Sequence, residues 1–190
     1  MTGLPGLGHN QGPTMEAGYT YRKHQWKKAR EALLPTLPLF VLKMRVKRAK
    51  ELGLDYKTYA GVRASTGRDV IGFLFSSNAL RLTTTTLPED TARKVGAITD
   101  ARKIAVLHRP LDPHAVGQAN PGLAVAEAPL FTDSWSETRR KIADAIAKER
   151  LPADGVLVVG ATSLEREWCA AARAAGYLSA DRYFAVAGGS

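Results

Sequence analysis

The chain has almost no cysteine and no long apolar run, and each shortage excludes a class of protein. Its 190 residues include one cysteine, Cys169, so an internal disulfide is excluded. The most apolar run, Leu33 to Leu42, is about ten residues long and contains two prolines, whereas a membrane-spanning helix needs about 20. Residues 1–14 lack the basic start and apolar core of a secretion signal. We therefore expect a cytoplasmic protein with no membrane partner.

Motifs of the common enzyme and metal-binding classes are also missing. The sequence has no Walker loop, no dinucleotide glycine fingerprint and no HExxH. The glycine-rich run at residues 6–13 lacks the Gly-Lys-Ser/Thr ending of a phosphate loop. His108 and His114 flank Asp112, but no further His or Cys lies near them to complete a metal site. We therefore predict no metal and no cofactor.

Positive charge, by contrast, is concentrated in one segment. Between Arg22 and Lys50 there are ten Lys or Arg and a single acid, Glu31. The net charge of this segment therefore equals the formal net charge of the whole chain, +9. Of the 27 basic and 18 acidic residues in the chain, the remaining 17 of each sign cancel. An exposed helix that serves only solubility normally alternates basic and acidic residues, which form stabilising ion pairs one turn apart. This segment has too few acids to form such pairs. It indicates a polyanionic partner, and we expect this partner to be nucleic acid.

Composition and pattern divide the chain into three parts. The first 19 residues are rich in Gly and Pro without apolar periodicity, which predicts a disordered tail. Its Gly-His-Asn-Gln-Gly-Pro run resembles short tails of bacterial and phage proteins of different kinds. Trp26, Ala29 and Leu33 then form one apolar stripe, which predicts a first helix over residues 20–34. We expect a tail at 1–19, a basic helical region at 20–67 and an α/β domain at 68–190.

Two further helices follow in the basic region. Residues 38–52 predict a helix with one apolar side, and Gly53 is a natural residue to end it. Asp55 is a suitable N-cap for a third helix, Tyr56 to about Ser65, which Gly67 closes.

The second and third of these helices resemble the helix-turn-helix of bacterial DNA-binding proteins. Ala49 takes the small position where the two helices approach, and Gly53 is the turn glycine four residues later. Arg48 departs from the pattern, because an apolar residue is usual there. The resemblance implies that Asp55 to Arg63 is the recognition helix. Its outward residues would be Tyr56, Lys57, Ala60, Arg63 and Ser65.

From residue 69 the pattern changes to short apolar runs that alternate with helical segments. The runs are typical of strands covered on both faces, and they lie at Val70–Phe75, Ile104–Leu107, Gly155–Gly160 and Tyr183–Val186. The helical segments are Glu89–Ile98, Glu137–Glu149 and Glu165–Ala175, of which the last two begin with capping boxes. This alternation predicts an α/β fold with a mostly parallel sheet of about four strands. Residues 109–133 are irregular, with room for a short strand at Leu123–Ala126.

Two functions follow from these features. The first is a nucleic-acid-binding protein, DNA more readily than RNA and regulatory in role, with phosphate contacts from Arg22, Lys23, Lys27, Lys28, Lys43, Arg45, Lys47, Arg48, Lys50, Lys57 and Arg63. The second is an α/β enzyme or a module that binds a nucleotide or phosphate ligand beyond the carboxyl ends of the strands. Its site would hold Ser76, Ser77, Asn78, His108, Arg109, Thr162 and Ser163. In the second case the basic helices would form a homodimer surface or dock an acidic partner; a pure interaction protein is a third alternative.

Overall fold

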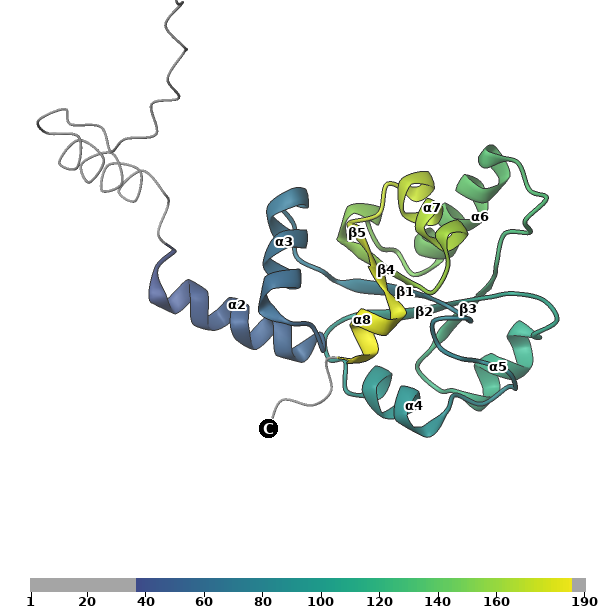
Figure 1. Cartoon of the computed structure of the whole chain (residues 1–190), viewed down its shortest axis with the longest axis horizontal. Coiled ribbons are helices and arrows are strands. Elements are labelled where there is room, and N and C mark those ends of the chain that lie inside the picture. Colours follow the sequence, from purple (N-terminus) through teal and green to yellow (C-terminus); the bar gives the residue numbers. More distant parts are fainter. Residues whose placement is uncertain (1–36, 186–190) are drawn as a thin grey trace, which may run out of the picture. The chain divides into compact units, whose positions relative to one another are not determined.

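The computed structural model describes residues 37–185 (Figure 1). Its elements, in chain order, are α2 (Leu39–Glu51), α3 (Tyr56–Thr66), β1 (Gly72–Ser76), α4 (Glu89–Gly96), β2 (Arg102–Leu107), α5 (Pro113–Ala119), β3 (Ala124–Glu127), α6 (Trp135–Lys148), a 3-10 turn (Ala153–Gly155), β4 (Val156–Gly160), α7 (Ser163–Ala172), β5 (Gly176–Ser179) and α8 (Ala180–Ala185). The predicted tail at 1–19 and the predicted helix at 20–34 lie outside the described residues, together with Arg22, Lys23, Lys27 and Lys28.

The five strands form one parallel sheet in the order β3-β2-β1-β4-β5. The predicted α/β class is therefore confirmed, with one strand more than expected. Strand β3 overlaps the short strand that the sequence allowed within residues 109–133. Because β2 and β4 pair with opposite sides of β1, the chain leaves β1 and β4 in opposite directions. This point is a topological switch, where open parallel sheets usually bind ligands.

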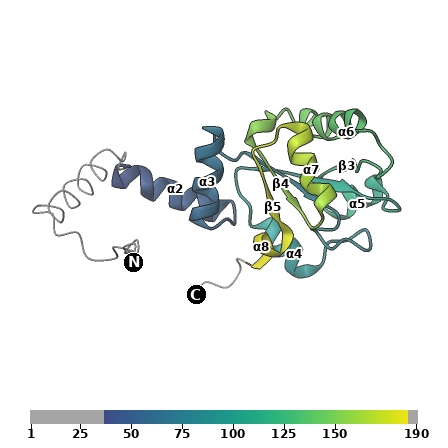
Figure 2. The ribbon, with the colours of Figure 1, turned by 45° about the horizontal axis from the view of Figure 1, so that its top comes forward.

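Helices cover both faces of the sheet (Figure 2). On one face, Phe73 and Phe75 of β1 pack with residues of α2, α3, α4, α5 and α8. On the other face, Leu74 of β1 packs against α6 and α7. Alternate residues of one strand thus serve two apolar clusters, which explains why β1 is apolar throughout.

The run at Tyr183–Val186 was predicted as a strand, and this prediction is wrong. Within residues 37–185 the last strand is β5, which pairs with β4, and Tyr183 lies on α8. The Tyr183 ring packs within 5.6 Å of the Phe73 ring and 5.5 Å of the Phe75 ring, centroid to centroid. A short apolar run is compatible with a buried helix as well as with a buried strand, so the sequence pattern did not distinguish the two.

Helices α2 and α3 begin and end close to where the sequence predicted. The turn between them contains Gly53, whose φ of 66° is left-handed. Asp55 caps α3 by accepting a hydrogen bond from the Thr58 amide at 2.8 Å. Ala49, Leu52, Leu54 and Tyr59 are buried in the first apolar cluster, so both helices pack on the domain that contains the sheet. Their use as a DNA-binding helix-turn-helix stays a prediction.

None of the helices between residues 37 and 185 combines the length and the apolar character needed to cross a bilayer.

Candidate functional sites at opposite edges of the sheet

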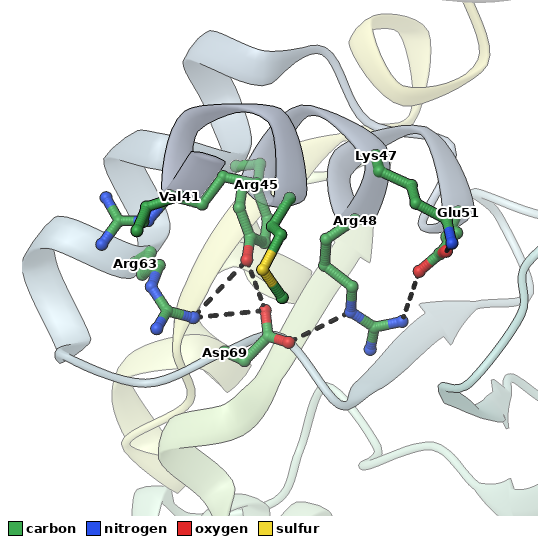
Figure 3. Close-up of a pocket in the computed structure, with 9 residues that line it drawn as sticks. Val41, Arg45, Lys47, Arg48, Glu51, Arg63 and Asp69 are labelled. Carbon is green, nitrogen blue, oxygen red and sulfur yellow. Dashed lines mark hydrogen bonds and ion pairs between the residues drawn. The ribbon is translucent and has the colours of Figure 1, made fainter. Parts of the chain in front are cut away.

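A pocket of about 400 Å³ lies beside α2 and α3 (Figure 3). It is lined by Val41, Met44, Arg45, Lys47, Arg48, Glu51, Tyr59, Arg63 and Asp69. Four of these residues were predicted to contact nucleic acid, and they come from both helices. The structure therefore brings part of the predicted basic set to one place.

Asp69 is the centre of the pocket floor. Its carboxylate accepts hydrogen bonds from the Tyr59 hydroxyl at 2.8 Å and from Arg48 Nε at 3.0 Å. Arg63 Nη1 lies 3.7 Å from the same carboxylate. Burial, followed by the hydrogen bond to Asp69 and its negative charge, raises the pKa of Tyr59 above its ordinary value. The floor is thus a closed network in which the acid is already neutralised by protein groups.

The Arg48 side chain is bonded to protein groups and is largely shielded from solvent. Besides Asp69, its guanidinium donates to the carbonyl oxygens of Val70, Thr99 and Asp100 at 3.0 to 3.3 Å, and its side chain is 16% exposed. These carbonyls precede β1 and β2, so Arg48 holds α2 at the amino edge of the sheet. Little of its guanidinium remains for a phosphate group.

The other predicted basic residues of α2 and α3 lie nearer to solvent. Lys43, Lys47 and Lys50 are exposed, and their spacing of four and three places them on one side of α2. Lys47 pairs loosely with Glu51 at 3.7 Å and its side chain stays 80% exposed. Lys57 is exposed on α3.

A second group of predicted residues lies at the carboxyl edge. Ser77 follows β1 and His108 follows β2, and the Ser77 hydroxyl oxygen is 2.8 Å from His108 Nδ1. The same oxygen accepts a hydrogen bond from the His108 amide at 3.1 Å. Ser76 is buried and accepts from the Ala79 amide, so it is part of the turn. Four exposed residues complete the predicted group at this edge, namely Asn78, Arg109, Thr162 and Ser163.

Glu165, which the sequence identified merely as a capping residue, is the fully buried centre of this edge. One carboxylate oxygen accepts from Asn78 Nδ2 at 2.8 Å and lies 3.7 Å from His108 Nε2. The other accepts from the amide of Thr162 at 2.9 Å and from the amide of Ala161. Three N–H groups around the start of α7, those of Ala161, Thr162 and Glu165, are therefore bonded within the protein. Only the Thr162-x-x-Glu165 spacing hinted at this residue.

Trp168 is a second residue that sequence reasoning missed. Its ring stacks on the His108 ring with centroids 5.5 Å apart. A small pocket of about 130 Å³ lies beside both rings, and its lip includes the exposed residues Leu130, Phe131 and Leu164.

The neighbourhood of His114 does not extend this site. The Asp112 carboxylate accepts from the amides of His114 and Ala115 and so caps α5. Within residues 37–185, no three side chains of His, Cys, Asp or Glu gather in a group that could hold a metal ion.

Comparisons of the chain with models of protein families, with curated proteins and with solved structures find no match.

Proposed function

We propose that the protein binds nucleic acid, DNA more readily than RNA, through the exposed side of α2 and the pocket beside it. The observation that carries this proposal is the common position of Arg45, Lys47 and Arg63, which come from two helices and line one pocket. Lys43 and Lys50 are exposed on the side of α2 that Lys47 shares, so positive charge continues from the pocket onto that side of the helix. Arg48 is left out of the contact set because its guanidinium is bonded to protein.

The binding depends on phosphate contacts and reads little sequence. The exposed residues of α3 are small apart from one cation, namely Lys57, Gly61, Ala64 and Ser65. Direct reading of bases needs side chains with paired donors and acceptors, such as Arg, Asn or Gln. Although partial burial opposes the effect, hydrogen bonds from Thr58 lower the pKa of Asp55, which places a negative charge at the start of α3. A recognition helix that enters a groove by this end would be repelled by phosphates.

The dependence of affinity on salt tests the proposal. The affinity of the full chain for a 20-base-pair DNA of mixed sequence and for a 20-nucleotide single strand is measured at several salt concentrations. The variant carries Lys43→Gln, Arg45→Gln and Lys50→Gln together. For each phosphate contact removed, we expect the slope of log affinity against log salt to become shallower by about 0.9 on duplex and about 0.7 on single strands.

The matched control carries Arg139→Gln, Arg140→Gln and Lys148→Gln, which change the net charge equally on the exposed side of α6. Helix α6 covers the face of the sheet opposite to α2. Equal slopes for both triple variants would show that net charge, and not the α2 surface, determines the affinity.

A second function is supported by a different observation, the cluster of Ser77, His108 and Glu165 at the topological switch. This arrangement supports a small-ligand site beside the His108 and Trp168 rings. A thermal-shift screen of small molecules tests it, because a ligand at 100 times its Kd stabilises by about 2.7 kcal/mol. The shift should be lost in His108→Ala and kept in His114→Ala, since His114 is exposed on α5. A shift that survives both changes would place the ligand elsewhere.

A further inference from the structure

The pocket beside α2 has an apolar wall that phosphate contacts do not explain. Val41 and Met44 line it together with the basic residues, and Met44 is 57% exposed. The backbone of a duplex presents charged groups on a convex surface, and it gains nothing from an apolar hollow. A flat nucleobase does, because its faces are apolar and a methionine adapts its shape to them.

The basic residues stand where the backbone of such a nucleotide would run. Arg45 and Lys47 belong to the same helix as Met44, and Arg63 approaches from α3 (Figure 3). Arg63 Nη1 lies 3.5 Å from the Tyr59 hydroxyl and 3.7 Å from Asp69, and its side chain is 34% exposed. A guanidinium has five N–H donors, so others remain for a phosphate or for stacking on a base.

The floor of the pocket carries little information about base identity. Asp69 already accepts from Tyr59, from Arg48 and from the Val70 amide at 2.9 Å. Because these donors use the carboxylate, the floor offers no free acceptor pattern to distinguish one base from another. A base in this pocket would be held by its faces, which all four bases share.

We infer that the pocket holds an unstacked base of single-stranded nucleic acid, with the base against Val41 and Met44 and the backbone beside Arg45, Lys47 and Arg63. The pocket volume of about 400 Å³ falls within the range of small-molecule sites, about 300 to 1,000 Å³. This inference rests on the proposed nucleic-acid function and names its form: the protein prefers single strands to duplexes.

Three DNA ligands of equal length test the inference by fluorescence anisotropy at one salt concentration. They are a 20-nucleotide thymidine strand, a 20-unit strand of abasic deoxyribose phosphates, and a 20-base-pair duplex. The first two have the same number of phosphates but differ in bases. Since stacking of a base is worth about 1 to 3 kcal/mol, we expect the thymidine strand to bind at least about fivefold more tightly than the abasic strand.

Two protein variants locate the effect. Met44→Ser removes one of the two apolar side chains of the wall without changing charge, and it should remove most of the preference for the thymidine strand while leaving duplex affinity within about twofold. The control is Phe40→Ser, because Phe40 is an exposed apolar residue of α2 that does not line the pocket. It should leave all three affinities unchanged.

The possible failures are distinct. Equal binding of thymidine and abasic strands, with the salt slope still dependent on α2, would overturn the inference and leave the phosphate contacts intact. A preference for thymidine that Met44→Ser does not alter would also overturn it, since the base would then bind elsewhere. Absence of binding to every strand would overturn both the inference and the nucleic-acid function.

Discussion

Arg48 on α2 and Asp69, just before β1, form an ion pair in which Arg48 Nε donates to Asp69 Oδ2 at 3.0 Å. The pair joins residues 21 positions apart and fixes α2 to the segment that leads into the sheet. It also explains the departure of this chain from the helix-turn-helix pattern. At the position where an apolar residue is usual, Arg48 contacts a carboxylate and three backbone carbonyls.

Removing one charge from a helix rich in cations should relieve repulsion between like charges. We nevertheless expect that replacing Arg48 by Met destabilises the protein. Met keeps the apolar stem, but Asp69 and the carbonyls of Val70, Thr99 and Asp100 each lose the hydrogen bond from Arg48. We expect a loss of about 2 kcal/mol in the free energy of unfolding, measured from urea transitions with an unchanged slope. Lys50→Met on the same helix is the control and should stay within about 0.5 kcal/mol. Equal stabilities of the two variants would contradict the structural role of Arg48.

The buried Tyr183 hydroxyl predicts a loss of stability at high pH. Burial raises the pKa of Tyr183 above its ordinary value of 10.0, so the unfolded chain ionises at a lower pH than the folded chain. Below about pH 10 neither state is ionised at this residue and its contribution is complete; above that pH the unfolded state is favoured by up to about 1.4 kcal/mol per pH unit.

Tyr183→Phe isolates this contribution. It keeps the ring against Phe73 and Phe75 and removes a long hydrogen bond of 3.4 Å to the Leu52 carbonyl. Near pH 8 we expect stability within about 1 kcal/mol of the wild type. Between about pH 10 and 11 the urea midpoint of the variant should fall less steeply than that of the wild type. Tyr59 and Tyr177, whose pKa values are also raised, remain in both proteins and cancel. Parallel curves would show that Tyr183 is not buried in solution.

Gly160 predicts a steric limit at the carboxyl edge. A Cβ at this position would lie 2.9 Å from Glu165 Cβ and 2.9 Å from Tyr177 Cε2. Gly160→Ala should therefore cost about 1 to 3 kcal/mol and displace Glu165 from its contacts. Gly61→Ala is the opposite case, because Gly61 lies within α3 and a Cβ there meets nothing within 4 Å. It should stabilise the protein by about 0.5 to 1 kcal/mol in the same urea measurement. If Gly160→Ala left the free energy of unfolding unchanged, the end of β4 would have room for a methyl group, which contradicts the close contacts with Glu165 and Tyr177.

Much of the fold follows from short-range patterns. The capping boxes at Ser134 and Thr162 are both formed, because each needs residues three positions apart. Asp55 and Gly67 cap α3 for the same reason. The apolar runs correctly located β1, β2 and β4, since strands buried on two faces need apolar residues throughout. Helix α5 was missed in the stretch expected to be irregular, where its length of seven residues is too short for a periodic signal.

The chain by itself determined the class of fold, most helix ends and the concentration of positive charge before residue 51, because each depends on composition or on neighbours in sequence. The tertiary structure decided which charges remain available: Arg48 is bonded to groups 21 to 52 residues away, whereas Lys43 and Lys50 on the same helix are exposed. It also decided that the Glu165 carboxylate lies 3.7 Å from His108 Nε2, and that Tyr183 belongs to a helix and not to the sheet. These outcomes depend on contacts between distant segments, and a periodic pattern in one segment carries no information about which other segment it will meet.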